Sequence, residues 1–277
     1  MANVKKVGIC QTKVLSDKQA NIFNAEAYII KAAQAGCHLV ILPEMFNCPY
    51  QTELFPSYAE RFPDGETIAW LSQIAAQQGI VLVGGSVAEH ATKSKIYNTS
   101  FIFDEKGALV ARHRKIHLCD VNVDGIPPVQ ESATLEPGEQ MTVVQAAGIK
   151  FGVGICYDIR FPELSRAMVL SGATLLIFPA AFSIVTGSVH WELLMKSRAV
   201  DNQAFVIGAA PARTKGAEYQ TWGHSMVVDP WGTVLAEADE KETLLTVEFD
   251  LDMTKDVRRK LPLLEHRRPD LYKAFCK

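Results

Sequence analysis

Cys156 has the local sequence of a catalytic nucleophile. It follows the apolar segment 151–155, which predicts a strand, and residues 161–164 predict a helix with Pro162 at its first position. The positive end of a helix dipole favours a thiolate over a thiol, so this position would activate the sulfur. The alternative is a buried structural cysteine. We assign that structural role to the other five cysteines, which are Cys10, Cys37, Cys48, Cys119 and Cys276.

Glu44 is a candidate general base. It ends the predicted strand 38–43, and the carboxyl ends of strands are where α/β proteins place their sites. A carboxylate that follows four apolar residues and a proline is poorly solvated, so its pKa should rise toward the range useful for a base. The alternative is a glutamate that reaches solvent at the strand end.

Lys115 lies in a basic segment in which strand alternation places residues 113, 115 and 117 on one face. If this face points inward, the lysine needs an anionic partner. His113 and His117 could be read with Cys119 as metal ligands, but their spacing brings two side chains together on a helix, whereas this segment follows a strand. We therefore expect no metal ion.

The elements that position these residues occur twice along the chain. Four pairs of segments match in the same order, namely 7–10 with 153–156, 39–46 with 175–182, 81–85 with 205–209 and 104–107 with 229–232. In this frame Cys156 corresponds to Cys10, whereas Glu44 corresponds to Ala180. The duplication therefore predicts that one half supplies the acid and the other supplies the thiol.

Each half is expected to open with a strand, a helix and a second strand. The first helix is predicted over 18–35, with Gly36 just beyond its end. Segments 39–42 and 175–178 are apolar at every residue, as in strands covered on both faces. Further elements are predicted as a helix over 66–78 and strands over 80–87, 97–103 and 108–114. The pattern predicts an α/β fold, a two-sheet sandwich whose halves have a pseudo-twofold relation.

Composition excludes several classes of protein. Apolar residues make up 48% and charged residues 21% of the 277-residue chain, which excludes a disordered protein. The net charge of −3 and the spread of basic residues give no footprint for nucleic acid or for an anionic membrane. The longest apolar stretch, 173–185, contains Pro179 and is shorter than the ~20 residues of a membrane-spanning helix. The cysteines show no disulfide spacing and residues 1–13 no signal peptide, so we expect a reducing, cytoplasmic setting.

Three motifs resemble those of the nitrilase (carbon-nitrogen hydrolase) superfamily, in the order that the family has them. Residues 42–44 resemble its general-base strand, 114–118 its lysine motif and 154–163 its nucleophile signature. The resemblance covers essentially the whole chain. It implies an α-β-β-α sandwich in a single domain of residues 1–277, with Glu44, Lys115 and Cys156 as catalytic residues. It also implies a homodimer or a higher homo-oligomer, with the tail of about 250–277 as a contact between subunits.

The resemblance further implies roles for residues that the pattern alone leaves open. Glu131 matches the second glutamate of the family, which helps to hold the lysine and to position the substrate. In the mechanism implied, Glu44 takes the proton of Cys156, the thiolate attacks an amide to form a thioester, and Lys115 and the backbone N–H of Tyr157 hold the oxyanion. No cofactor is implied.

Within the superfamily the likeness is closest to the omega-amidases, which implies hydrolysis of 2-oxoglutaramate or 2-oxosuccinamate to the acid and ammonia. The segments that carry this likeness are 46–50, 97–99, 186–187 with 190–194, 197–203 and 222–225. Such a substrate needs a cation for its distal carboxylate. Arg160 could serve, although an ion pair with Asp158 is its alternative role, and Lys115 and Arg213 are further candidates.

Two other functions compete with this interpretation. The first is a deaminated-glutathione amidase or another carbon-nitrogen hydrolase of the same fold, which differs only in the pocket. The second is a catalytically silent scaffold, which an intact set of Glu44, Lys115 and Cys156 disfavours. A papain-like cysteine hydrolase is also disfavoured, because no histidine is needed when a glutamate and a lysine accompany the cysteine.

Overall fold

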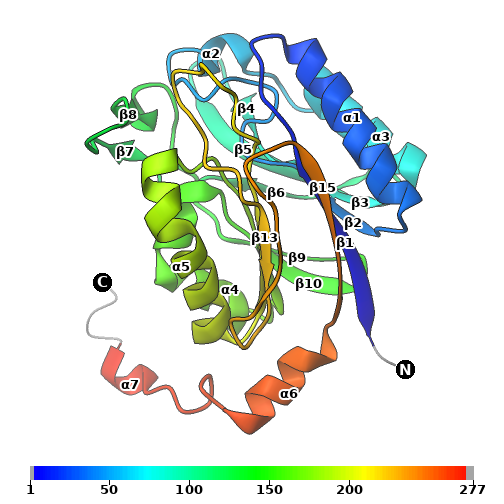
Figure 1. The fold of residues 1–277 in the computed structure, drawn as a ribbon, viewed down its shortest axis with the longest axis vertical. Helices are drawn as coiled ribbons and strands as arrows, with labels where there is room; N and C mark the ends of the chain where they lie inside the picture. The colour runs from blue at the N-terminus through cyan, green and yellow to red at the C-terminus, as the bar shows by residue number, and fades with distance from the viewer. Residues whose placement is uncertain (1–2, 273–277) are drawn as a thin grey trace.

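The computed structural model describes residues 3–272 and shows a sandwich of four layers (Figure 1). Two sheets face each other, and helices cover their outer faces. The predicted α-β-β-α sandwich is confirmed.

The first sheet has the strand order β15-β1-β2-β3-β5-β4, with β6 paired to β5. Its strands are β1 (Val4–Gln11), β2 (Leu39–Ile41), β3 (Val81–Val83), β4 (Val87–His90), β5 (Ile96–Phe103), β6 (Leu109–Arg114) and β15 (Thr243–Asp250). Helices α1 (Lys18–Gln34) and α3 (Glu66–Gln78) cover its outer face with a cluster that includes Ile29 and Leu71, and the short helix α2 (Phe55–Tyr58) lies beyond its edge.

The second sheet has the strand order β14-β13-β12-β11-β10-β9. Its strands are β9 (Thr142–Ala146), β10 (Ile149–Val153), β11 (Leu175–Pro179), β12 (Phe205–Ala209), β13 (Met226–Val228) and β14 (Val234–Glu237). Helices α4 (Pro162–Leu170) and α5 (Ile184–Asn202) cover its outer face through Met168 and Trp191. A two-stranded hairpin of β7 (Asp120–Val121) and β8 (Val129–Gln130) stands apart from both sheets.

Strand alternation builds the core between the two sheets. Val7 and Ile9 of β1 point into it, and Phe151 and Val153 of β10 meet them from the other side. The residues between, such as Cys10, face the helices instead. Each central strand is therefore apolar on both faces, as the sequence predicted.

The order of strands in the internal repeat is confirmed, but its first predicted match is wrong by two residues, because Val7 corresponds to Phe151 rather than to Val153 and Cys10 therefore does not correspond to Cys156. Strands β1 and β2 pair in parallel with Val7 opposite Leu39, and β10 and β11 pair in parallel with Phe151 opposite Leu175. The two matched turns also agree in detail, because Asp104 and Asp229 each cap a hairpin through the same pair of backbone N–H groups, two and four residues further on. Strand β15 then returns from the second half to pair with β1.

One predicted strand is broken. The segment 80–87 forms β3 and the start of β4, with a gap at residues 84–86. Gly85 has a φ of +56°, and a Cβ on it would lie 2.1 Å from the carbonyl oxygen of Pro43. At the break, the backbone of Gly85 therefore lies against the end of the strand that carries Glu44. The Ser86 hydroxyl also accepts a hydrogen bond from the N–H of Met45 at 3.0 Å.

Helices α6 (Asp252–Lys260) and α7 (Pro269–Tyr272) lie outside the sandwich (Figure 1). The contact between subunits predicted for residues 250–277 stays a prediction, and its last five residues lie outside the described chain. No helix of residues 3–272 has the length and apolar character needed to cross a membrane.

Candidate active site

The predicted site residues each follow the end of a regular element. Glu44 comes three residues after β2, and Lys115 directly follows β6. Cys156 opens a single 3-10 turn, Cys156–Arg160, three residues after β10. Glu131 opens another short 3-10 turn, Glu131–Ala133, directly after β8. The sandwich brings the four residues together, although they come from both halves of the chain.

Lys115 lies at the centre of the site. Its Nζ donates hydrogen bonds to Glu44 Oε1 and to Glu131 Oε1, each at 2.8 Å, and all three side chains are fully buried. Burial alone would lower the pKa of Lys115, but the charges of Glu131 and Glu44 outweigh it and raise that pKa well above its usual value. The ammonium group therefore stays charged, and with both carboxylates ionised the three residues carry a net charge of −1.

Neighbouring donors fix the two carboxylates. The Tyr50 hydroxyl donates to Glu131 Oε1 at 2.9 Å, and the backbone N–H of Cys119 donates to Glu131 Oε2 at 2.7 Å. Asn98 Nδ2 donates to Glu44 Oε1 at 2.9 Å. Glu44 Oε2 is buried without a partner in the described structure. It is thus the one carboxylate oxygen of the pair that is available to take a proton.

Burial raises the pKa of Glu44, and the nearby ammonium of Lys115 only partly offsets this effect. The direction predicted from the sequence is therefore confirmed. A buried carboxylate of raised pKa, in a cluster with an excess negative charge, is suited to accept a proton from a neighbouring acid.

Cys156 is held in an unfavourable backbone conformation. Its φ is +44°, in the left-handed region that costs an L-residue about 1–2 kcal/mol. The side chain is 5% exposed, and the backbone N–H of Ala181 points at its Sγ from 3.5 Å. A strained residue at a site marks a position where geometry is selected over local stability.

The expected activation of the thiol by a helix dipole is wrong. Burial and the charge of Glu44 raise the pKa of Cys156 well above its usual value. The turn that Cys156 opens has five residues, and α4 begins only at Pro162. The sulfur rests as a thiol, so it needs a base in contact rather than a dipole.

The alternative role of Arg160, an ion pair with Asp158, is not found in the part of the chain that the structure describes. The carboxylate of Asp158 accepts hydrogen bonds from His113 Nε2 at 3.0 Å and from His117 Nδ1 at 2.8 Å. The two histidines therefore have an anionic partner inside the protein. Among residues 3–272, no group of three His, Cys, Asp or Glu side chains is arranged to hold a metal ion.

Cys156 opens into a cavity of about 220 Å³. Tyr157 and Arg160 line the same cavity, and the Arg160 guanidinium lies 4.7 Å from the ring centroid of Phe182. Arg160 NH1 lies 3.3 Å from His190 Nδ1, and within the described chain Arg160 forms no ion pair. The guanidinium therefore remains available to an anion.

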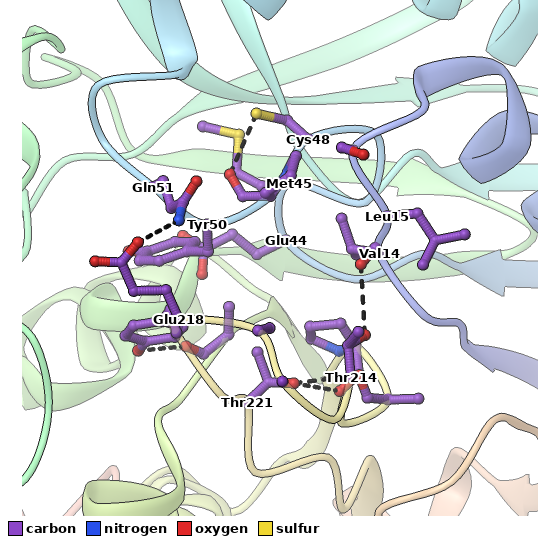
Figure 2. Close-up of a pocket in the computed structure, with 18 of the residues that line it drawn as sticks. Val14, Leu15, Glu44, Met45, Cys48, Tyr50, Gln51, Thr214, Glu218 and Thr221 are labelled. Carbon is purple, nitrogen blue, oxygen red and sulfur yellow. Dashed lines mark hydrogen bonds between the residues drawn. The ribbon is translucent and has the colours of Figure 1, made fainter.

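A second cavity, of about 480 Å³, reaches the site from the side of Glu44 (Figure 2). In Figure 2 the segment that carries Tyr50 and Gln51 faces the loop that carries Thr214 and Glu218. Gln51 Nε2 donates to Glu218 Oε2 at 2.6 Å, which joins the two sides. Tyr50 also lines the smaller cavity, as does Tyr219, and their ring centroids are 4.8 Å apart. The tyrosine pair thus forms a wall shared by the two cavities.

The guanidinium of Arg213 is bonded to backbone carbonyl oxygens. Its guanidinium donates to the carbonyl oxygens of Thr221 and Trp222, each at 3.2 Å, and it lines neither cavity. Two carboxylates take two of the three N–H donors of Lys115 and balance its charge. Of the three cations considered for a substrate carboxylate, Arg160 is the one whose charge is unpaired beside the thiol.

Comparisons with known proteins agree with this geometry. A sequence model of the Carbon-nitrogen hydrolase family matches residues 6–259. The chain is 46% identical over 267 residues to the omega-amidase NIT2 of Xenopus tropicalis, covering 96% of each chain. It is 43% identical over 272 residues to the omega-amidase NIT2 of Homo sapiens, covering 98% of each.

Solved structures agree as well. The nitrilase-superfamily member Nit3 of Saccharomyces cerevisiae superimposes with a TM-score of 0.89 at 42% identity, over 96% of this chain and 97% of that one. A variant of the amidase from Nesterenkonia sp. AN1, with an acetamide moiety added covalently to its active-site cysteine, superimposes with a TM-score of 0.81 at 25% identity. That match covers 99% of this chain and 97% of the other.

The chain belongs to the carbon-nitrogen hydrolase family, within the nitrilase superfamily. It is an enzyme of the amidase class.

Sequence reasoning missed several residues that shape the site. Tyr50 and Asn98 lie in segments singled out only for their likeness to omega-amidases, yet they hold Glu131 and Glu44 in place. A signal for Asn98 was present, because an amide in the middle of a buried strand needs a polar partner. Ala181 contributes through its backbone, which no side-chain pattern reveals.

Proposed function

We propose that this amidase hydrolyses the terminal amide of a short 2-oxo dicarboxylate monoamide, such as 2-oxoglutaramate or 2-oxosuccinamate, through a thioester on Cys156. One observation carries the proposal: the thiol and an unpaired guanidinium, that of Arg160, line the same cavity of about 220 Å³. The thiol would meet the amide, and Arg160 the distal carboxylate. The relatives named omega-amidases support this choice of substrate.

Glu44 begins the proposed reaction by taking the proton of Cys156. The proton raises the charge of the cluster of Glu44, Lys115 and Glu131 from −1 to zero, and the sulfur takes up the negative charge. The total charge of the site is unchanged, which matters in a buried site, where each uncompensated charge costs several kcal/mol. The raised pKa of Glu44 makes it a stronger base than an ordinary glutamate, which favours the transfer, whereas the raised pKa of Cys156 opposes it.

The thiolate then attacks the amide carbon. Lys115 and the backbone N–H of Tyr157 would hold the oxyanion that forms, at donors already in place before the reaction. Glu44 returns its proton to the nitrogen, the C–N bond breaks and ammonia leaves. In the second half Glu44 takes a proton from water, and the hydroxide oxygen attacks the thioester. The C–S bond then breaks, the carboxylic acid leaves, and Glu44 returns its proton to the sulfur of Cys156.

Arg160 would make the enzyme selective for a substrate that carries a carboxylate. Its planar guanidinium matches a carboxylate with two parallel hydrogen bonds, and the faces of Phe182 and Tyr157 hold it at the cavity wall. A neutral analogue would leave the guanidinium without a counter-charge. We therefore expect strong selection for an anionic substrate.

The test compares kcat/KM for 2-oxoglutaramate, 2-oxosuccinamate, deaminated glutathione, an N-carbamoyl amine and a neutral amide of equal length. The wild-type enzyme should prefer 2-oxoglutaramate to the neutral amide by roughly 100-fold or more. Arg160→Gln should remove most of that preference while leaving the neutral amide nearly unaffected. A preference above about tenfold for deaminated glutathione or the carbamoyl amine, about 1.4 kcal/mol, would contradict the proposed substrate.

The larger cavity favours a second candidate. Ammonia occupies about as much space as a water molecule, roughly 30 Å³, so it would leave most of the 480 Å³ beside Glu44 unfilled. An amide whose nitrogen carries a substituent, as in deaminated glutathione, could place its leaving amine there. Ala217→Phe would narrow this cavity, and it should lower kcat/KM for such an amide more than for 2-oxoglutaramate if the second candidate is right.

We also propose that the enzyme is a cytoplasmic homo-oligomer. Cys10, Cys37, Cys48, Cys119 and Cys156 are free thiols, which supports a reducing compartment. Apolar side chains exposed on α5 support an interface between subunits.

A further inference from the structure

We propose that Asp158 and the two histidines beside Lys115, His113 and His117, form a positioning network that sets the nucleophile and the lysine relative to each other. The proposal rests on the proposed roles of Cys156 and Lys115. None of the three residues touches the reacting atoms, so they would act through the residues they hold.

The network centres on one fully buried carboxylate. Asp158 Oδ1 accepts hydrogen bonds from His117 Nδ1 at 2.8 Å and from the backbone N–H of His117 at 3.0 Å. Asp158 Oδ2 accepts from His113 Nε2 at 3.0 Å and from the backbone N–H of Ile155 at 2.9 Å. Four donors from two distant segments thus converge on a single side chain.

These bonds connect the segments that carry the chemistry. Asp158 lies two residues after Cys156, and its bond to Ile155 closes the turn in which Cys156 has its strained φ of +44°. His113 and His117 lie two residues on either side of Lys115. The carboxylate therefore holds the turn of the nucleophile against the strand end of the lysine, at the point where the two halves of the molecule meet.

The carboxylate at the centre of the network keeps its charge. Burial alone would raise the pKa of Asp158, but hydrogen bonds from His113 and His117 outweigh it and hold that pKa far below its usual range. Asp158 thus stays ionised at every pH at which the enzyme could work. His117 is further fixed by stacking on Phe161, at 3.6 Å between ring centroids, and His113 by Thr142 Oγ1 at 3.2 Å from its Nδ1.

The two histidines use different ring nitrogens, and this difference gives a sharp test. The amide nitrogen of glutamine takes the place of Nε2, whereas that of asparagine takes the place of Nδ1. His113→Gln and His117→Asn therefore keep the donor to Asp158, while His113→Asn and His117→Gln lose it. At each histidine position, the Gln and Asn variants have nearly the same polarity and burial.

We expect the matched variants to keep kcat within about threefold of wild type. The mismatched variants should lose about tenfold or more in kcat, with KM changed less than about twofold, because misplacing reacting groups slows the chemical step. The rate at which iodoacetamide alkylates Cys156, followed by mass spectrometry, should fall in the same two mismatched variants. His38→Asn, at an exposed position at the opposite end of β2 from Glu44, serves as the control and should match the wild-type enzyme.

Two outcomes would overturn the network. In one, asparagine and glutamine act alike at each position. In the other, the mismatched variants lose thermal stability while the kcat of the folded enzyme and the alkylation rate stay at wild-type values, which would make the network purely structural. Failure of the proposed function is distinguishable, since it would show as turnover that survives Cys156→Ala.

Discussion

At the scale of single residues, the site balances charge rather than lowering individual pKa values. Lys115 is shared by Glu44 and Glu131, and Cys156 lies where burial keeps its proton on. The residue types and their strand-end positions were predictable from the sequence, because short apolar runs before Glu44 and Cys156 place both at strand ends. Their ionisation was not, since it depends on which groups from the other half of the chain lie beside them.

Cys156→Ala should abolish turnover, because Cys156 carries the proposed nucleophile and the charge of Glu44 acts on its thiol. Stoichiometric alkylation of the wild-type enzyme should modify Cys156 in step with the loss of activity, as followed by peptide mass spectrometry. Cys119→Ala provides the matched control, since Cys119 lines the same cavity. Its hydrogen bond to Glu131 comes from the backbone N–H, which the substitution keeps. Inactivation with Cys156 unmodified would end the assignment.

The pH profile follows from the two raised pKa values. The active form has one proton on the pair of Cys156 and Glu44, so the first ionisation of the pair sets the acid limb and the second sets the alkaline limb. Because the pKa of Glu44 is raised from 4.5, activity should fall at a higher pH on the acid side than for an ordinary glutamate. Because the pKa of Cys156 is raised well above 9.0, the alkaline limb should lie beyond that value.

Values of kcat/KM measured from about pH 4 to about pH 10 would locate the acid limb and show whether activity persists beyond pH 9.0. A plateau that continues below pH 4.5 would show that Glu44 does not act as the base. Glu44→Gln should remove turnover at every pH without unfolding the protein, since the amide keeps the hydrogen bond geometry at Oε1.

At the scale of elements, the sequence predicted helices better than strand breaks. Helix α3 has the predicted bounds, Glu66–Gln78, and α1 ends one residue early with Gly36 beyond it. The run 80–87 looked continuous because residues 80–83 and 87 are apolar. The break arises from close contact with Pro43, which is 42 residues away in the sequence and has no local signal.

Gly85→Ala should destabilise the protein strongly and lower activity. Its φ of +56° disfavours alanine, and the added Cβ would clash with the Pro43 carbonyl oxygen at 2.1 Å. Gly36→Ala is the matched control, with a φ of +81° but no atom within 4 Å of the added Cβ. Gly36→Ala should cost about 1–2 kcal/mol, and Gly85→Ala several kcal/mol.

Denaturant unfolding of both variants measures the difference, which isolates the close contact from the cost of positive φ. Assays of the folded variants then separate the site from the scaffold. Gly36→Ala should keep wild-type kcat, whereas Gly85→Ala should lower it because the strand end that carries Glu44 must move. Equal effects on stability would mean that the backbone at Gly85 relaxes without moving Pro43.

At the scale of the whole molecule, the duplication divides the work between the halves. The general base, the lysine and the second glutamate come from residues before β9, and the nucleophile and Arg160 come after it. The sequence repeat predicted this division, since Glu44 has Ala180 as its counterpart. What it could not predict is the bridge of Asp158 to His113 and His117, because a contact between halves leaves no periodic pattern in either.

The exposed surface of α4 and α5 predicts how the molecule assembles. Helix α5 exposes an apolar stripe of Val189 and Leu193, which are 63% and 62% accessible, and Leu170 at the end of α4 is 51% accessible. Large apolar side chains grouped on one face of a soluble protein mark an interface. We therefore expect this face to be covered by a second copy of the chain.

Leu193→Glu should shift the protein from a dimer or larger oligomer toward the monomer, because it would bury a charge in an apolar contact. Light scattering at micromolar concentration measures the change. Phe23→Glu is the matched control, since Phe23 is 76% exposed on α1, which packs on the other sheet, and it should leave the oligomeric state unchanged. A wild-type monomer would contradict the expectation outright. An oligomer that tolerates Leu193→Glu but dissociates with Phe23→Glu would move the interface to the face of α1.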